Sequence, residues 1–192
     1  MNPIKLIACL ACTLVTSTLI SSCEKDSDNS GFIVKNGIPF TGAQIRPVAS
    51  PSPGSGEMDV WYDKETKVLN YALRWTGLTD SVIAIRINGP APIGFNAVNP
   101  AFSPAPAAFT SFATTPYREV QTFLGSAPRA LLPPSGTFAG SMLVDGVRVT
   151  EDNLMNGQYF VTLHTKTLLP VAIPGSFLFR WLGEVRAQIT LQ

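Results

Sequence analysis

The chain has 192 residues, of which 45% are hydrophobic and 14% charged, and its formal net charge is +1. This apolar composition excludes a disordered polymer, and the balanced charge argues against a surface that binds nucleic-acid phosphates. Its 16 prolines and 15 glycines favour a turn-rich β protein over a helical bundle, and its single histidine, His164, argues against a multi-histidine metal site.

The first 22 residues have the features of a bacterial secretion signal. Lys5 is the only charged side chain before 6–20, an uncharged and mostly apolar stretch that is short for a membrane span. Residues 20–23, Ile-Ser-Ser-Cys, resemble a lipobox, in which two small residues precede the cysteine that is diacylated and becomes the new N-terminus. We therefore predict a lipoprotein signal peptide over 1–22 and lipidation of Cys23. The alternative is an uncleaved anchor or a secretory signal cut elsewhere.

A polar tether is predicted over 23–36, because 24–31 is acidic and rich in serine and other residues that favour solvated chain. Cys9 and Cys12 lie inside the predicted signal, so cleavage leaves no thiol for a disulfide or a metal. A triacylated Cys23 exceeds the two lipid signals that stable anchoring requires. We expect an outer-membrane lipoprotein of the cell envelope, facing the periplasm or the cell surface.

From Gly37 onward, apolar and polar residues alternate with the period of two that is typical of β-strands. We predict strands, in chain order, over 41–46, 57–62, 68–75, 81–88, 117–123, 137–143, 159–165 and 184–191. The second and third form an antiparallel hairpin around the charged turn 63–67. Its register places Leu69, Tyr71, Leu73 and Trp75 in the core.

Prolines interrupt 89–116, so a long excursion is predicted there. Its phenylalanines, Phe95 among them, favour a loop folded down onto the body of the domain. Thr150 is suited to cap a helix of one or two turns, since Glu151 and Asp152 follow in the first turn and Gly157 can close its end. The many short strands and one short helix predict an all-β domain over 37–192, either an antiparallel β-sandwich or a partly open barrel.

Three segments together resemble the CHRD domain, a module of chordin, the extracellular growth-factor antagonist, and of many bacterial secreted or lipid-anchored proteins. The first is LNYALRWTGL at 69–78, similar to a strand that ends in a Gly-Leu turn. The second is AIRINGPA at 84–91, at the place of the family's His-Ile-His-Gly segment. The third joins GQYFVTLHT at 157–165 to GEVRAQ at 183–188, similar to a closing Gly-Glu-Ile-Arg-Gly-Gln. The resemblance implies an immunoglobulin-like or Cu/Zn-superoxide-dismutase-like sandwich.

The family-motif positions in this chain are Arg86, Asn88, His164, Glu184 and Arg186. Arg86 and Asn88 replace the two family histidines, and their spacing of two places both on one face of a strand. Two histidines there, with His164, would resemble a metal-binding set. Arginine cannot bind a cation, however, and a lone imidazole is a poor site. We therefore expect no metal, no cofactor and no catalytic residue.

Each motif position has a structural and a functional interpretation, and we favour the structural one in each case. His164 is interpreted as a structural or surface imidazole, against a ligand or general base. Glu184 and Arg186 are interpreted as an ion pair between neighbouring strands, against a catalytic acid. Arg86 beside Asn88 is interpreted as a hydrogen-bonded surface pair, against a site for an anion or a sugar hydroxyl.

An apolar insertion over 166–182, with Leu169, Phe177, Phe179 and Trp181, separates the two parts of the closing motif. It adds to the core if it packs down, and it offers a partner site if it stands out. With 92–116 it supplies the candidate partner loops. The predicted function is a lipid-anchored, non-catalytic binding module whose partners are the membrane and an envelope protein or glycan, without nucleic acid. The alternative is a metal-dependent redox or hydrolytic enzyme related to histidine-bearing CHRD proteins.

Overall fold

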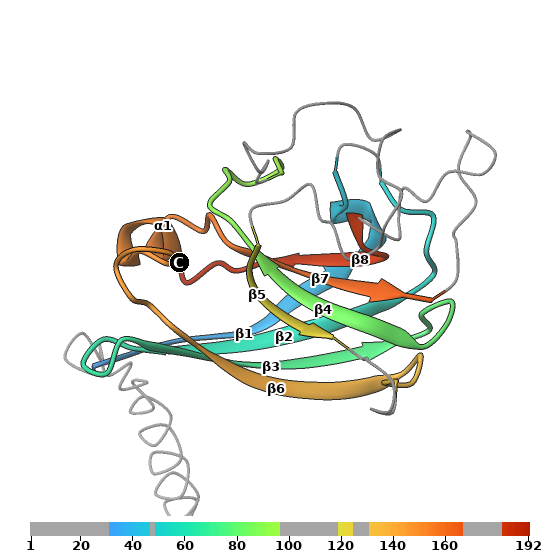
Figure 1. Ribbon diagram of the computed structural model, residues 1–192, viewed down its shortest axis with the longest axis horizontal. Coiled ribbons are helices and arrows are strands. Elements are labelled where there is room, and N and C mark those ends of the chain that lie inside the picture. Colours follow the sequence, from blue (N-terminus) through green and yellow to red (C-terminus); the bar gives the residue numbers. More distant parts are fainter. Residues whose placement is uncertain (1–30, 47–48, 97–118, 125–130, 167–181) are drawn as a thin grey trace, which may run out of the picture. The chain divides into compact units, whose positions relative to one another are not determined.

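A computed structural model of the protein describes residues 31–46, 49–96, 119–124, 131–166 and 182–192. Within these ranges eight strands form one antiparallel sheet in the order β5-β4-β7-β8-β1-β2-β3-β6 (Figure 1). The elements are β1 (Phe32–Thr41), the 3-10 helix η1 (Gly42–Gln44), β2 (Ser55–Asp63), β3 (Val68–Thr76), β4 (Val82–Asn88), β5 (Glu119–Leu124), β6 (Gly136–Leu143), α1 (Glu151–Met155), β7 (Phe160–Thr165) and β8 (Val185–Gln188). The predicted all-β class is confirmed.

The period-two alternation of β2 and β3 places one side of each strand in the core. The predicted inward stripe of β3 is confirmed, since its four members, Leu69, Tyr71, Leu73 and Trp75, are at most 4% exposed. Val60 of β2 is the register partner of Tyr71 and is also buried. Full burial of such a side chain contributes about 1.5–3 kcal/mol, so this stripe stabilises the hairpin strongly.

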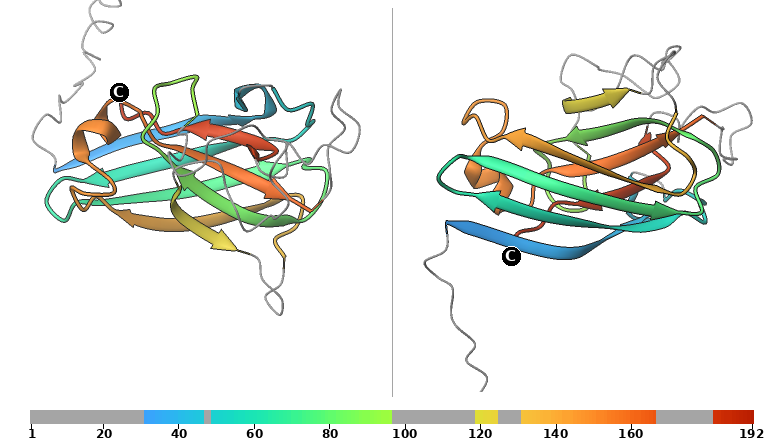
Figure 2. Two further views of the ribbon diagram at one scale, coloured as in Figure 1. Left: turned by 45° about the horizontal axis from the view of Figure 1, so that its top comes forward. Right: turned by 90° about the horizontal axis from the view of Figure 1, so that it is seen from below.

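The sheet curls so that its two halves enclose a common core (Figure 2). Apolar residues of β4, β7 and β8 join the same buried cluster as those of β2 and β3. Thr41 and Arg186 are the one register pair that links β1 to β8, and so the two halves. At the other side, Gln121 Nε2 of β5 donates to the Ser141 carbonyl of β6 at 3.1 Å. The result is a single folded-over sheet, and a side-chain hydrogen bond of β5 joins its two edge strands, β5 and β6.

The strand predicted over 41–46 is wrong, because the chain turns there. Gly42–Gln44 forms η1, and the carbonyl of Gly42 accepts hydrogen bonds from the amides of Ile45 and Ser50. The first strand lies earlier, and Phe32–Thr41 includes residues 32–36, which the sequence assigned to the tether. A register shift between Lys35 and Ile38 interrupts the alternation, which hid this strand from a period-two search.

The predicted short helix is confirmed as α1. The Thr150 hydroxyl accepts from the Asn153 amide at 3.4 Å, and Gly157 follows the helix with a φ of +64°. The other predicted strands are confirmed where they fall on described residues, with small shifts at their ends. No helix in the described ranges has the length and hydropathy needed to cross a membrane.

Candidate functional site: a buried polar face and the loop that it holds

Strands β4, β7 and β8 place most of the family-motif positions on one face. Arg86 is the register partner of Thr162, and Thr162 that of Arg186. Alternate residues of these strands face the apolar core. The other side, which we call the polar face, carries Arg86, Asn88, Thr162, His164, Arg186 and Gln188.

The polar face is buried. Its members are between 0% and 7% exposed, with Asn88 and His164 at 0% and Arg86 at 3%. Arg86 and Asn88 are therefore not the surface pair that the sequence favoured. Buried polar groups destabilise a fold unless they are hydrogen-bonded, so the bonding of this face decides what it does.

Asn88, Thr162 and His164 form one hydrogen-bonded chain. Asn88 Nδ2 donates to Thr162 Oγ1 at 3.3 Å, and Thr162 Oγ1 lies 2.9 Å from His164 Nε2. The Thr162 hydroxyl has one proton and two lone pairs, so the tautomer of His164 decides which of the two groups donates in this second bond. The arrangement is that of a structural imidazole, the interpretation that the sequence favoured.

Arg186 connects β8 to the loop that follows β4. Its Nη1 donates to Asn96 Oδ1 at 3.1 Å, and its Nη2 donates to the Phe95 carbonyl at 2.9 Å and to Gln188 Oε1 at 2.6 Å. Its guanidinium carbon lies 3.6 Å from the centre of the Phe160 ring, in a cation–π contact. One buried side chain thus holds a loop backbone and a loop side chain together.

Glu184 is a second buried junction, with 0% exposure. Its Oε1 accepts from Ser52 Oγ at 2.6 Å and from the Thr79 amide at 2.8 Å. Its Oε2 accepts from Thr79 Oγ1 at 2.7 Å and from Thr165 Oγ1. Four donors therefore meet the two oxygens of one carboxylate, and they come from three separate segments of the chain.

The sequence favoured an ion pair between Glu184 and Arg186, but the structure gives the two side chains different partners. The salt bridges found among the described residues include partly exposed side chains, and Glu184 takes part in none of them. Glu184 instead joins neighbouring segments by accepting hydrogen bonds, and Arg186 does so by donating them.

The donor set of the polar face does not fit a resident metal ion. Arg86 supplies no lone pair for a cation, and His164 is the only imidazole in the chain. No group of three or more His, Cys, Asp or Glu side chains suited to a metal occurs in the described part of the chain. Cys23 and the candidate loop residues Leu169, Phe177, Phe179 and Trp181 lie outside the described residues.

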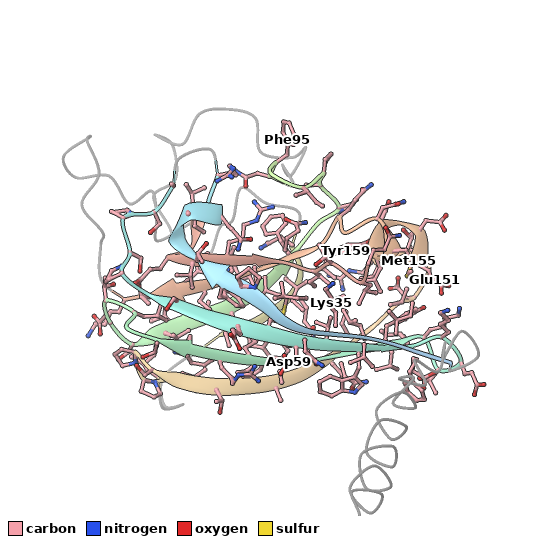
Figure 3. The ribbon with its side chains drawn as sticks, turned by 180° about the vertical axis from the view of Figure 1, so that it is seen from behind. Lys35, Asp59, Phe95, Glu151, Met155 and Tyr159 are labelled. Atoms are coloured by element: carbon pink, nitrogen blue, oxygen red, sulfur yellow. The ribbon has the colours of Figure 1, made fainter. Side chains whose placement is uncertain are left out.

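The loop over 91–96, which we call the display loop, carries two large exposed side chains. Ile93 is 61% and Phe95 65% exposed. The Phe95 amide donates to the Pro92 carbonyl at 3.0 Å, closing a turn in which Gly94 has a φ of +84°, a region that favours glycine. Figure 3 shows Phe95 pointing away from the sheet, on the side of the molecule opposite Asp59.

The display loop is held at both ends. The Ala91 amide donates to the Gln158 carbonyl at 2.8 Å. At the other end Asn96 Nδ2 donates to the Arg46 carbonyl at 2.6 Å, beside the contacts that Arg186 makes. The sequence placed this segment in a candidate partner loop, but it did not single out Ile93, and the expectation that the phenylalanines fold onto the body is wrong for Phe95, which is 65% exposed. The Pro92-Ile93-Gly94 sequence, which is typical of a turn, was the available signal.

Comparison with known proteins identifies the family of the chain. A family model described as the CHRD domain matches residues 38–175, which include Arg86, Asn88 and His164 and end before Glu184. The searches of curated proteins and of solved structures gave no match. Because the family match covers more than half of the sequence, the chain belongs to the CHRD domain family.

Proposed function

We propose that this protein is a non-catalytic binding module of the cell envelope, anchored by lipid on Cys23, which contacts an envelope protein or glycan through its display loop. Membership of the CHRD family indicates a binding or interaction module. The lipobox-like segment before Cys23 and the polar residues after it support the anchor.

The observation that carries the proposal is a contrast in burial between Arg186 with the other motif residues and the loop that Arg186 holds. The motif residues are all buried, and Arg186 and Glu184 hydrogen-bond to distant parts of the fold. By contrast, Ile93 and Phe95, on the loop that Arg186 holds, are more than half exposed. Large apolar side chains on a pre-formed loop bind partners with a small loss of conformational entropy. Aromatic side chains are also frequent among the residues that dominate interface affinity.

Recovery of envelope partners by the full chain tests the binding role. The double variant Ile93→Ser, Phe95→Ser should lose its cross-linked or co-purified partner, because the apolar contact is removed while the buried network is kept. Val147→Ser is the matched control, since Val147 is 79% exposed but lies outside the display loop. Equal partner recovery from the double variant and the wild type would refute this role of the loop.

The intact mass of the purified protein tests the anchor. A processed lipoprotein should lack the first 22 residues and carry acyl mass on Cys23. The variant Cys23→Ser should remain unprocessed and unacylated. A wild-type mass that includes residues 1–22, or that lacks acyl chains, would refute the anchor independently of the binding experiment.

A further inference from the structure

The outward face of the half-sheet β1-β2-β3-β6 has a cluster of exposed apolar side chains at one end. Phe32 is 53%, Val34 58%, Trp61 36% and Leu143 60% exposed. Val34 is the register partner of Trp61. Phe32 and Leu143 end one row across the four strands, and Asp63 and Val68 lie between them in that row. Strands about 4.8 Å apart make this row roughly 15 Å wide. We call these four residues the apolar end.

The other end of the same face is charged. Arg74 donates to Asp59 Oδ2 at 2.5 Å and to Glu57 Oε2 at 3.0 Å. The hydrogen bond from Arg74 is the main cause that lowers the pKa of the Asp59 carboxyl below its ordinary value. The large exposed apolar side chains thus gather at one end of the face, around Asp63, and the ion pairs of Arg74 lie at the other end.

The predicted tether joins the sheet at the apolar end. The Gly31 carbonyl accepts a hydrogen bond from the Lys64 amide at 2.7 Å, which fixes Gly31 beside the turn between β2 and β3. Phe32 follows directly. Cys23 precedes Gly31 by 31 − 23 = 8 residues. Eight residues span at most about 26–29 Å, so a lipid on Cys23 keeps the apolar end within this distance of the bilayer.

We propose that the apolar end rests on the phospholipid bilayer in which the Cys23 lipid is inserted. This inference depends on the lipid anchor of the proposed function. Tryptophan and phenylalanine are enriched at the membrane–water interface, and an apolar surface adds to the binding that an acyl anchor provides. Phe95 lies on the opposite side of the molecule from this face (Figure 3), so the display loop is presented away from the membrane.

Fluorescence quenching in vesicles tests this orientation with the full, lipidated chain. The variant Val34→Cys receives a thiol-reactive fluorophore, and Thr137→Cys is the matched control. Thr137 lies on the same outward face of β6 but opposite Arg74, at the charged end, and is also exposed. Phosphatidylcholine vesicles with nitroxide-labelled headgroups should quench the fluorophore at position 34 several-fold more strongly than at position 137.

A second variant set shows that the apolar side chains cause the contact. Trp61→Ser combined with Leu143→Ser should remove most of the quenching at position 34 while the chain still sediments with the vesicles. Both side chains are exposed, so the fold should remain, as near-UV circular dichroism would show.

The outcomes separate this inference from the anchor. A chain that sediments with vesicles but is quenched equally at positions 34 and 137 overturns the bilayer contact and leaves the anchor standing. A chain that does not sediment overturns both. Shielding of position 34 that persists in detergent and rises with protein concentration identifies a second copy as the occupant, and it also overturns the bilayer contact.

Discussion

Replacement of Glu184 by alanine removes the acceptor of four hydrogen bonds at once. Its donors belong to the segment before β2, to the turn between β3 and β4 and to the end of β7. The hydroxyls of Ser52, Thr79 and Thr165 can rotate toward other acceptors or water. The amide of Thr79 cannot, because its direction is fixed by the backbone.

The loss of folding stability in Glu184→Ala follows from the number and the burial of these hydrogen bonds. Each hydrogen bond to a charged group contributes about 1.5–3 kcal/mol, so four give roughly 6–12 kcal/mol before desolvation is counted. Removing the carboxylate also removes the cost of burying its charge, which is several kcal/mol. We therefore expect Glu184→Ala to lower the free energy of unfolding by about 3–5 kcal/mol. At about 2–4 °C per kcal/mol, the Tm falls by roughly 6–20 °C.

Urea unfolding of the full chain, followed by tryptophan fluorescence, measures this loss as a shift in midpoint at constant slope. The matched control is Glu57→Ala, which removes the same side chain from an exposed pair with Arg74 and should cost about 0–1 kcal/mol. Glu184→Gln keeps one acceptor oxygen and should lie between the two. If Glu184→Ala shifted the midpoint no more than Glu57→Ala, the assignment of Glu184 as a structural junction would fail.

Three further results are expected. Gly56→Ala should destabilise the fold by about 2–4 kcal/mol in the same unfolding assay, because its Cβ would overlap the backbone carbonyl of Arg74. Gly31→Ala is the control and should be neutral, because its Cβ would meet only the Glu65 side chain, at 3.5 Å. Hydrogen bonds from backbone amides, that of Val149 first, lower the pKa of Asp145. The stability that the ionised Asp145 adds is therefore present above the unfolded-state pKa of about 3.9, and it is lost as the pH falls through the pKa of the folded state. The urea midpoints of the wild type and of Asp145→Asn should then converge in acid. Arg186→Lys keeps the charge but loses the planar fork, and we expect weaker partner recovery together with faster proteolysis of the display loop; an unchanged cleavage rate would show that Arg186 does not hold it.

The sequence predicted most strands because alternation reports which side chains enter the core. Leu69 and Tyr71 illustrate this: their register partners Tyr62 and Val60 are buried like them, and the polar Asn70 lies between them along the chain. The prediction failed at 41–46, where the chain turns through η1, and at residues 32–36, where a register shift breaks the period. Both failures arise from backbone geometry that side-chain hydropathy does not record.

The polar face shows a second limit of prediction from the sequence. Alternation places Arg86 and Asn88 opposite Ile85 and Ile87, so the sequence correctly separates these residues from the apolar core. A polar side in such a pattern normally faces water, and the surface interpretation followed from that rule. The structure adds contacts between segments that are distant in sequence, such as the bond from Arg186 of β8 to Asn96 in the loop after β4. Local periodicity contains no information about those contacts.

This arrangement separates the residues that stabilise the fold from those that are available for binding. Arg186 bonds to the Phe95 carbonyl and to the side-chain amide of Asn96, and Glu184 bonds to hydroxyls and an amide outside the loop. These contacts do not require particular apolar side chains on the display loop. Ile93 and Phe95 project from that loop and are more than half exposed, and exposed substitutions away from caps and networks change stability by about 0.5 kcal/mol or less. The loop surface is therefore free to differ in shape and chemistry while the same buried junctions position it. In this chain, therefore, the buried side chains of Glu184 and Arg186 fix how the segments around them are held, and the exposed side chains of the display loop can change without disturbing these contacts.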